Sequence, residues 1–157
     1  MNLIVAVDIN WGIGKDNDLL ISIPEDMKLF RTMTSGSTII MGRKTLESFP
    51  NGKPLKNREN IVLSSSNIDK DVKVFHSIND VLTYVNNKEN VFVIGGGSIY
   101  KQLLPYCDRA YVTKIHKDFN ATIFFPNLDE LEDWNLIEIG NIKEWNGIKF
   151  QFNIYEK

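Results

Sequence analysis

Val91-Phe92-Val93-Ile94-Gly95-Gly96-Gly97-Ser98-Ile99-Tyr100-Lys101-Gln102-Leu103-Leu104-Pro105 is the stretch of this sequence that decides the fold. Its first residues are apolar or β-branched and predict a buried strand, and the residues after the glycines show a helical pattern that ends at Pro105. Because glycine has no Cβ, three in a row let the backbone bend sharply and lie against a ligand. The free N–H groups at the start of the next helix favour an anion. A tight turn alone would explain a glycine pair, but three glycines at this junction favour an anion or nucleotide site.

Two better-known phosphate motifs are excluded by their spacing. Tyr100 stands where the dinucleotide-binding fingerprint of a Rossmann fold has its third glycine. The stretch from Gly36 to Thr45 lacks the spacing of a P-loop, and Arg43 separates its last glycine from Lys44. A nucleotide would therefore be held here in neither of these two ways.

Size and composition are those of one globular domain, which we expect to span residues 1–157. The 18 basic and 20 acidic residues give a formal net charge of −2, so the composition does not favour nucleic acid binding. No apolar run is long enough to span a bilayer, and Met1–Asp8 predicts a strand rather than a signal segment. The single Cys107 excludes an internal disulfide and suits a reducing compartment. Together these features predict a cytoplasmic monomer with no membrane partner.

Hydrophobic patterning predicts eight strands and four helices. The expected strands are Leu3–Asp8, Thr38–Met41, Asn60–Leu63, Val72–Phe75, Val91–Ile94, Arg109–Ile115, Asn135–Ile139 and Ile148–Tyr155. The expected helices are Pro24–Met33, Arg43–Ser48, Ile78–Val85 and Ser98–Leu104. The early strands are continuously apolar, as parallel strands covered on both faces should be, and the Asn146-Gly147 turn predicts a C-terminal antiparallel hairpin. The pattern predicts an α/β fold, a single-domain sandwich with a mixed, largely parallel eight-stranded sheet flanked by four helices.

In such sheets, ligands gather at the carboxyl ends of the strands. This rule places the loops after Asp8, Met41, Leu63 and Ile94 around one cleft. The loop at residues 10–17, rich in flexible and turn-forming residues, lies at the mouth of that cleft. It could serve as a lid or as an ordinary connection.

Asp26 is the strongest candidate in the sequence for a functional carboxylate. Ser22-Ile23-Pro24-Glu25 predicts a helix start with Ser22 as the cap. On the helix that follows, Asp26 shares a face with Phe30 and Met33, which aligns a carboxylate with residues that should face the interior. Asp26 either complements the positive end of the helix or pairs with the N–H groups of a ligand, and in the second case desolvation would raise its pKa.

Gly42-Arg43-Lys44-Thr45 is a second candidate phosphate site, because a glycine, two cations and a hydroxyl stand at a helix start. A solvated basic helix start is the alternative. Two such sites on one sheet favour a ligand with several phosphates, and Ser64-Ser65-Ser66 would add hydroxyl groups nearby. His76 and His116 have no partners at metal-ligand spacing, so we expect no metal site.

At this point the residues match a family. The chain resembles dihydrofolate reductase essentially from end to end. The likeness rests on Leu3-Ile4-Val5-Ala6-Val7, Ile13-Gly14, Ile23-Pro24-Glu25-Asp26-Met27, Ile40-Met41-Gly42-Arg43-Lys44-Thr45, Glu47-Ser48, Arg58-Glu59-Asn60-Ile61-Val62-Leu63-Ser64, Val93-Ile94-Gly95-Gly96-Gly97-Ser98-Ile99-Tyr100, Tyr111-Val112-Thr113 and Phe124-Phe125-Pro126. In this order and at these separations the pieces are specific.

The resemblance implies reduction of 7,8-dihydrofolate to tetrahydrofolate, with a hydride from NADPH reaching C6 and a proton reaching N5. By this resemblance Asp26 binds the amino group and ring N–H of the pterin, and Thr113 supports Asp26 through a hydrogen bond. Leu19 is the third residue that the resemblance places among the catalytic residues. It also implies antifolate inhibitors as partners. The substrate-binding residues that it implies are Ile4, Val5, Asp26, Met27, Phe30, Ser48, Phe49, Leu55, Arg58, Ile94 and Thr113.

The resemblance also implies which residues bind NADPH. They are Ala6, Ile13, Gly14, Gly42, Arg43, Lys44, Thr45, Leu63, Ser64, Ser65, Ile94, Gly95, Gly96, Gly97, Ser98, Ile99 and Tyr100. Ala6 and Ile13 would position the nicotinamide, and Arg43, Lys44 and Ser65 match the residues that recognise the 2′-phosphate. The Gly95-Gly96 peptide bond matches a family position where this bond is cis.

The chain departs from the family in three places. Ile21 replaces the usual Trp before the Asp, with Leu20 where Pro is common; Leu46 replaces a frequent Trp; and Thr122 holds an acidic position that steadies the lid in some members. We expect an active enzyme with altered loop dynamics. A reductase of a riboflavin precursor shares this architecture but gives no reason for Asp26 with Arg58, and a non-catalytic folate- or nucleotide-binding protein is the third alternative.

Overall fold

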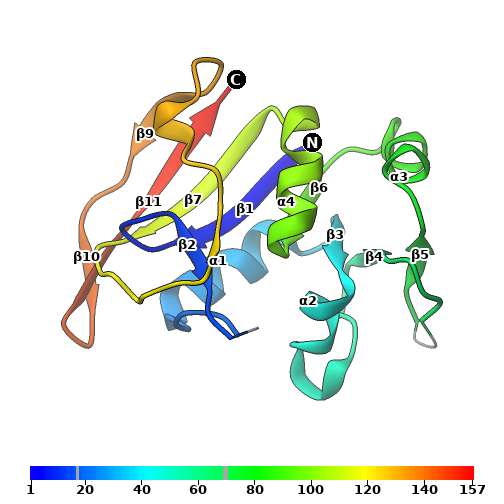
Figure 1. Cartoon of the computed structure of the whole chain (residues 1–157), viewed down its shortest axis with the longest axis horizontal. Coiled ribbons are helices and arrows are strands. Elements are labelled where there is room, and N and C mark those ends of the chain that lie inside the picture. Colours follow the sequence, from blue (N-terminus) through cyan, green and yellow to red (C-terminus); the bar gives the residue numbers. More distant parts are fainter. Residues whose placement is uncertain (17, 69–70) are drawn as a thin grey trace.

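A sheet of mixed strand direction forms the centre of the molecule (Figure 1). The computed structural model describes residues 1–16, 18–68 and 71–157. In that part of the chain, eight strands follow one another in the order β10-β11-β7-β1-β6-β3-β4-β5, and β9 also pairs with β11. The strands of this sheet are β1 (Asn2–Val7), β3 (Thr38–Gly42), β4 (Glu59–Leu63), β5 (Lys73–Phe75), β6 (Val91–Gly95), β7 (Arg109–Ile115), β9 (Asn135–Ile139), β10 (Lys143–Trp145) and β11 (Ile148–Glu156). Strand β11 is antiparallel to its neighbours, whereas β1, β3, β4, β5, β6 and β7 pair in parallel with one another. The predicted mixed, largely parallel sheet is therefore confirmed.

The four predicted helices are present. They are α1 (Pro24–Thr34), α2 (Arg43–Glu47), α3 (Ile78–Val85) and α4 (Gly97–Leu103). Short 3-10 turns follow at Pro50–Gly52, Leu104–Tyr106 and Leu128–Glu130. Every predicted helix and strand ends within one residue of its observed end. No helix in the described part of the chain is both long and apolar enough to cross a membrane.

Three strands were not predicted individually. Two of them, β2 (Gly12–Gly14) and β8 (Ile123–Phe124), pair with each other in a separate two-stranded sheet. They are too short for an alternating pattern to be visible in the sequence. The third, β10, is the partner strand of the predicted hairpin, and positive φ angles of 49° at Asn146 and 76° at Gly147 confirm the expected tight turn.

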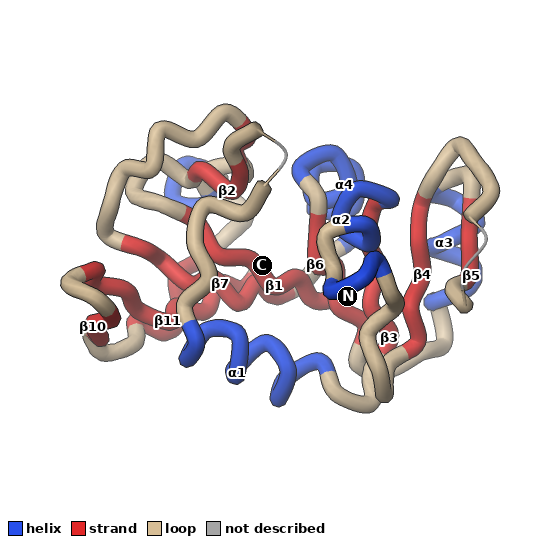
Figure 2. The backbone as a smooth tube through the Cα atoms, turned by 90° about the horizontal axis from the view of Figure 1, so that it is seen from below, coloured by secondary structure: helices blue, strands red, loops and turns tan. Residues whose placement is uncertain are grey.

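The two faces of the sheet bury separate sets of apolar side chains. On β1, Leu3, Val5 and Val7 lie in the largest core cluster, which α3 and α4 cover. Ile4 points to the other face and packs against a second cluster, to which α1 contributes Met33 and α2 contributes Leu46. Figure 2 shows α1 on one side of the sheet and α4 on the opposite side. The carboxyl ends of β1, β3, β4 and β6 are therefore flanked by helices from both layers.

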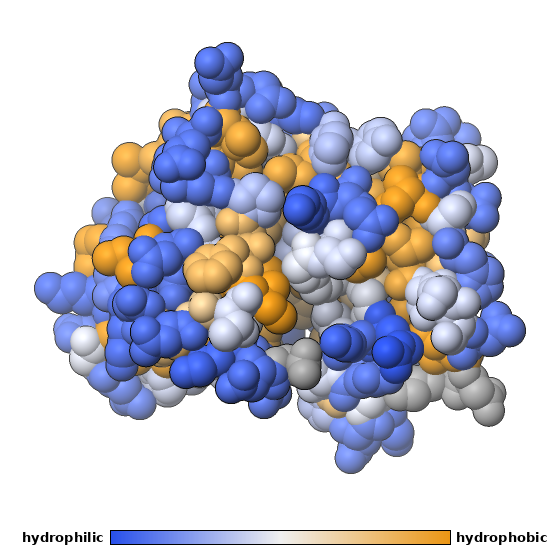
Figure 3. Space-filling view, viewed as in Figure 1, coloured by the Kyte–Doolittle hydropathy of each residue, from blue (hydrophilic) through white to orange (hydrophobic). Residues whose placement is uncertain are grey.

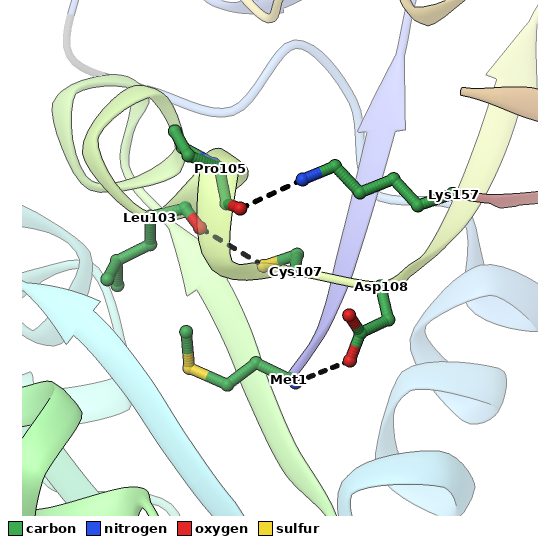
Figure 4. A network of polar contacts seen from close by, with 6 residues as sticks. All are labelled: Met1, Leu103, Pro105, Cys107, Asp108 and Lys157. Carbon is green, nitrogen blue, oxygen red and sulfur yellow. Dashed lines mark hydrogen bonds and ion pairs between the residues drawn. The ribbon is translucent and has the colours of Figure 1, made fainter. Parts of the chain in front are cut away.

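The turn between α4 and β7 is held by polar contacts (Figure 4). The Cys107 thiol is 1% exposed and donates to the Leu103 carbonyl at 3.4 Å. Next to it, the Met1 amino group donates to the Asp108 carboxylate at 3.3 Å, and Lys157 Nζ donates to the Pro105 carbonyl at 2.8 Å. Cys107 is therefore a small residue packed in the turn, without the exposure that a reactive thiol needs.

Candidate active site

The helix that carries Asp26 begins differently from the prediction. Its N-cap is Ile23, and the predicted cap by Ser22 is wrong. A residue before proline is held in extended backbone, and Ile23 (φ −97°, ψ 121°) precedes Pro24. The helix therefore starts directly after Ile23, and Ser22 lies one residue too early to cap it. Glu25 and Asp26 stand in the first turn, where negative charge complements the helix dipole.

Asp26 reaches from α1 to strand β7. The buried Thr113 hydroxyl donates to Asp26 Oδ1 at 2.6 Å, so the two predicted partners are in contact. Burial raises the pKa of the Asp26 carboxyl above its ordinary value, and the hydrogen bond from Thr113 opposes this rise in part. The charge of Asp26 also reaches Tyr100, whose pKa is raised first by burial and then by Asp26. The Tyr100 hydroxyl itself donates to the Ile4 carbonyl at 2.7 Å.

The predicted substrate residues lie around α1 and the second core cluster. Four of them, Ile4, Phe49, Leu55 and Ile94, pack as half-buried side chains against that cluster. The Arg58 guanidinium lies 5.9 Å from the centroid of the Phe30 ring, and its Nε donates to Thr34 Oγ1 at 2.9 Å. Burial and then the charge of Arg31 lower the pKa of Arg58.

The remaining predicted substrate residues differ in exposure. Met27 is half-buried on α1 and Ser48 is exposed after α2, with its hydroxyl donating to the Thr45 carbonyl at 2.6 Å. The Val5 side chain is 6% exposed and belongs to the core on the other face of β1. Only the backbone of Val5 can therefore meet a ligand on the Asp26 side of the sheet. Leu19 is 69% exposed in the loop before α1.

The two predicted phosphate sites are neighbours. The N-cap of α2 is Gly42, and the N-cap of α4 is Gly96. A Cβ added at Gly95 would lie 3.3 Å from Thr45 Oγ1, and one at Gly42 would lie 3.1 Å from Ile99 Cγ1. The Gly95-Gly96 peptide bond is cis, as the resemblance implied. Both glycine segments therefore form one cradle between α2 and α4, with backbone N–H groups and small side chains at its surface.

The two-stranded sheet of β2 and β8 covers the start of α4. It carries Ile13, Gly14 and Ile123, and a Cβ added at Gly97 would lie 2.8 Å from Ile123 Cγ2. The Thr122 amide donates to the Gly14 carbonyl and the Phe125 amide to the Trp11 carbonyl, at 2.9 Å and 2.8 Å. Apolar surface is visible over β2 in the space-filling view (Figure 3). Asn17, the last residue of the predicted lid loop, lies outside the described residues.

Asp8 has a structural role that sequence reasoning missed. Its side chain is fully buried, and Oδ1 accepts from the amides of Asn10 at 2.8 Å and Gly12 at 2.7 Å. Its Oδ2 accepts from the amide of Phe119 at 3.2 Å. One carboxylate thus joins the loop after β1 to the loop after β7. The available signal was an acidic residue directly after the apolar strand Leu3–Val7.

A polar cavity of about 250 Å³ extends the cradle toward β5 and α3. It is lined by Leu63, Ser64, Ser65, His76, Ser77, Ile78, Ser98, Ile99 and Gln102. Five of these residues were predicted to bind the cofactor. His76, Ser77, Ile78 and Gln102 were not, because the turn between β5 and α3 carries no motif of its own.

Comparison with known proteins agrees with this architecture. A model of the dihydrofolate reductase family matches residues 1–157. The chain is 45% identical to dihydrofolate reductase of Bacillus subtilis, over 100% of this chain and 94% of that protein. It is 40% identical to dihydrofolate reductase of Staphylococcus haemolyticus, over 100% of this chain and 95% of that protein.

A solved structure gives the same result. Dihydrofolate reductase from Enterococcus faecalis in complex with NADP(H) and RAB-propyl superposes with a TM-score of 0.87 at 34% identity, covering 99% of this chain and 94% of the other. With the paired Asp26 and Thr113, the glycine cradle and these full-length matches, the chain belongs to the dihydrofolate reductase family.

Proposed function

We propose that this chain reduces 7,8-dihydrofolate to 5,6,7,8-tetrahydrofolate with NADPH, by hydride transfer to C6 and protonation at N5. Its membership of the family supports this activity. The observation that carries the proposal is the half-buried Asp26 carboxyl, which Thr113 holds on the inner side of α1. A carboxyl group in that position recognises a ring that presents an amino group and an N–H side by side.

The substrate is held mainly by α1 and the segments that face it. Asp26 binds the amino group and ring N–H of the pterin, and Thr113 orients the carboxyl. Ile4, Met27, Phe30, Phe49, Leu55 and Ile94 supply apolar contacts, Ser48 a hydroxyl, Val5 its backbone, and Leu19 a contact from the lid side. Arg58, fixed beside Phe30, pairs with the carboxylate of the glutamate tail.

The glycine cradle would hold the cofactor, and NADPH would supply the hydride when bound. Ala6, Ile13, Gly14, Ile94 and Gly95 would position its nicotinamide end, beside which Tyr100 fixes β1 through the Ile4 carbonyl. The residues that would bind the phosphates are Gly42, Arg43, Lys44, Thr45, Gly96, Gly97, Ser98 and Ile99. Leu63, Ser64 and Ser65 would contact the adenosine end.

Protonation at N5 depends on the charge of Asp26. A negative carboxylate beside the pterin stabilises the positive charge that protonation creates on the ring. Asp26 therefore favours the reaction without delivering the proton itself. The lid excludes bulk water from the hydride acceptor while the reaction proceeds.

The protein works as one domain, residues 1–157, acting as a cytoplasmic monomer without nucleic acid, and antifolate inhibitors occupy the substrate site.

The test follows the absorbance of NADPH when the purified protein meets dihydrofolate, with NADH in a parallel reaction. Rapid loss with NADPH and slow loss with NADH is the expected result. Binding of NADPH and dihydrofolate without loss of absorbance would instead identify a non-catalytic binding protein. In that case Ile21, which replaces the usual Trp, is the first residue to restore.

A further inference from the structure

A second cavity, of about 190 Å³, lies between α1 and the sheet. Figure 2 shows α1 lying along this face of the sheet. Leu29 and Met33 line the cavity from α1, Tyr111 lines it from β7, and Phe152 and Ile154 line it from β11. The cavity therefore has a largely apolar wall that includes two aromatic rings.

This cavity is separate from the proposed substrate site. Asp26 and Phe30, four residues apart, share the face of α1 that turns to the substrate, and neither of them lines the cavity. Leu29 projects in a direction rotated by about 100° from Phe30, because one residue of a helix turns by that angle. The two sites share a wall at Ile4 and Thr113. The helix and this wall keep their contents apart.

The size and lining of the cavity favour a single aromatic ring. An apolar protein cavity of about 150 Å³ is already large enough to bind benzene. Tyr111 and Phe152 lie in the wall, and a third ring between apolar and aromatic side chains gains ring contacts in addition to its buried area. A larger ring system would exceed the volume.

A carboxylate is part of the wall. Glu138 on β9 is the one charged residue among the described residues that line the cavity. Its side chain is exposed, and no ion pair or hydrogen bond engages its carboxylate in the described part of the chain. Arg109 on β7 is paired with Glu156. Lys143 on β10 is paired with Glu25, so neither of these two cations neutralises Glu138. The cavity thus complements a ligand with a positive charge beside its apolar part.

We propose that this cavity is a binding site for a small aromatic amine, with the ring held between Leu29 and Phe152 and the ammonium group at the Glu138 carboxylate. The binding is non-covalent. The inference is independent of the proposed function, because neither dihydrofolate nor NADPH takes part in it.

The first test compares benzylamine with benzyl alcohol, which has nearly the same shape and no charge. The chemical shifts of the Met33 and Ile154 methyl groups in NMR titrations give the two affinities. We expect benzylamine to bind about two- to fivefold more tightly than benzyl alcohol, as an exposed ion pair allows. Glu138→Gln should abolish this difference. Glu144→Gln, which removes the same charge from the exposed part of β10, is the matched control and should preserve it.

The second test fills the cavity. Leu29→Phe places a ring in the space, so the variant should bind neither compound. Leu136→Phe adds the same ring at an exposed position of β9 that does not line the cavity, and it should bind both compounds as the parent does. Saturating dihydrofolate should leave the affinity of the parent for benzylamine unchanged.

Three outcomes would overturn the inference. Displacement of benzylamine by dihydrofolate would place the amine in the substrate site. Equal affinity of the parent and Glu138→Gln for benzylamine would remove the carboxylate from recognition, and unchanged binding by Leu29→Phe would place both compounds elsewhere. Oxidation of NADPH by dihydrofolate is measured separately, so a failure of the proposed function does not alter the result of these titrations.

Discussion

Replacing Asp26 with asparagine keeps the shape of the side chain and removes a charge that is costly to bury. Burial raises the pKa of Asp26 in the folded protein, with the Thr113 hydrogen bond in opposition, whereas the unfolded chain has the ordinary value of 3.8. As pH rises above 3.8, the unfolded state therefore loses its proton first. Between 3.8 and the raised pKa of the folded protein, the free energy of unfolding therefore falls as the pH rises. Above this range the parent protein is less stable than a variant with a neutral amide.

The size of this effect follows from linkage. A tenfold change in the protonation equilibrium corresponds to about 1.4 kcal/mol, and 1 kcal/mol shifts the Tm of a protein of this size by about 2–4 °C. We expect Asp26→Asn to unfold at a higher temperature than the parent protein at neutral pH, because the parent carries the desolvated charge there and the variant does not. The difference should shrink as the pH falls and vanish well below 3.8, where the carboxyl is protonated in both the folded and the unfolded state. Hydride transfer by the same variant should fall by about 10²- to 10⁴-fold at neutral pH and recover in part in acid.

The assay is thermal unfolding of both proteins across this pH range, with NADPH affinity as a measure of an intact fold. Asp16→Asn, on an exposed loop, removes one charge from water and serves as the matched control. If parent and Asp26→Asn give parallel stability curves, the carboxyl is not desolvated and the reasoning fails. Unchanged turnover in the variant would refute the catalytic assignment.

Three further predictions concern single contacts. Thr113→Val removes the 2.6 Å hydrogen bond to Asp26, and kcat/KM for dihydrofolate should fall about tenfold, as expected for one hydrogen bond to a charged group. Gly140→Ala places a Cβ 2.3 Å from the Phe152 carbonyl oxygen, and the free energy of unfolding measured in urea should drop by about 1–3 kcal/mol. Burial raises the pKa of Cys107 to about 12, so a disulfide reagent at pH 8 should label the native protein far more slowly than the unfolded protein.

Each of these has a contradicting outcome. Thr38→Val is the control for the first, because Thr38 also donates to a carboxylate, Glu59, but lies on β3. An equal loss of kcat/KM in Thr113→Val and Thr38→Val would show that the loss comes from replacing a buried threonine and not from removing the contact with Asp26. An unchanged unfolding curve for Gly140→Ala, or labelling of native Cys107 at the rate of an exposed thiol, would contradict the packing described for those residues.

Local signals in the sequence carried most of the fold. The continuous apolar runs, the three glycines after Ile94 and the Asn146-Gly147 turn each act over a few residues, and each structure that they predicted is present. The error at Ser22 is also local, because the restriction that Pro24 places on Ile23 outweighs the preference for a serine cap. Such signals can be interpreted without knowledge of the tertiary contacts of the chain.

The parts that were missed depend on contacts between distant residues. Asp8 accepts from an amide 111 positions away, and His76 becomes a cavity residue only because β5 lies beside β4. The pairing of Asp26 with Thr113 spans 87 positions, and the resemblance to a family supplied it where pattern alone did not. A role that arises from the packing of two distant loops produces neither a hydrophobic periodicity nor a motif of fixed spacing in the sequence.

The small sheet of β2 and β8 combines two kinds of position. The Asp8 carboxylate and the side chains of Trp11 and Phe125 are buried, the last two in the main core, so substitutions there should lower the stability of the whole domain. Thr122 and Phe124 are exposed, so they can change at little cost to folding. A chain of this kind can therefore vary the outer surface of the small sheet while its inner edge stays fixed.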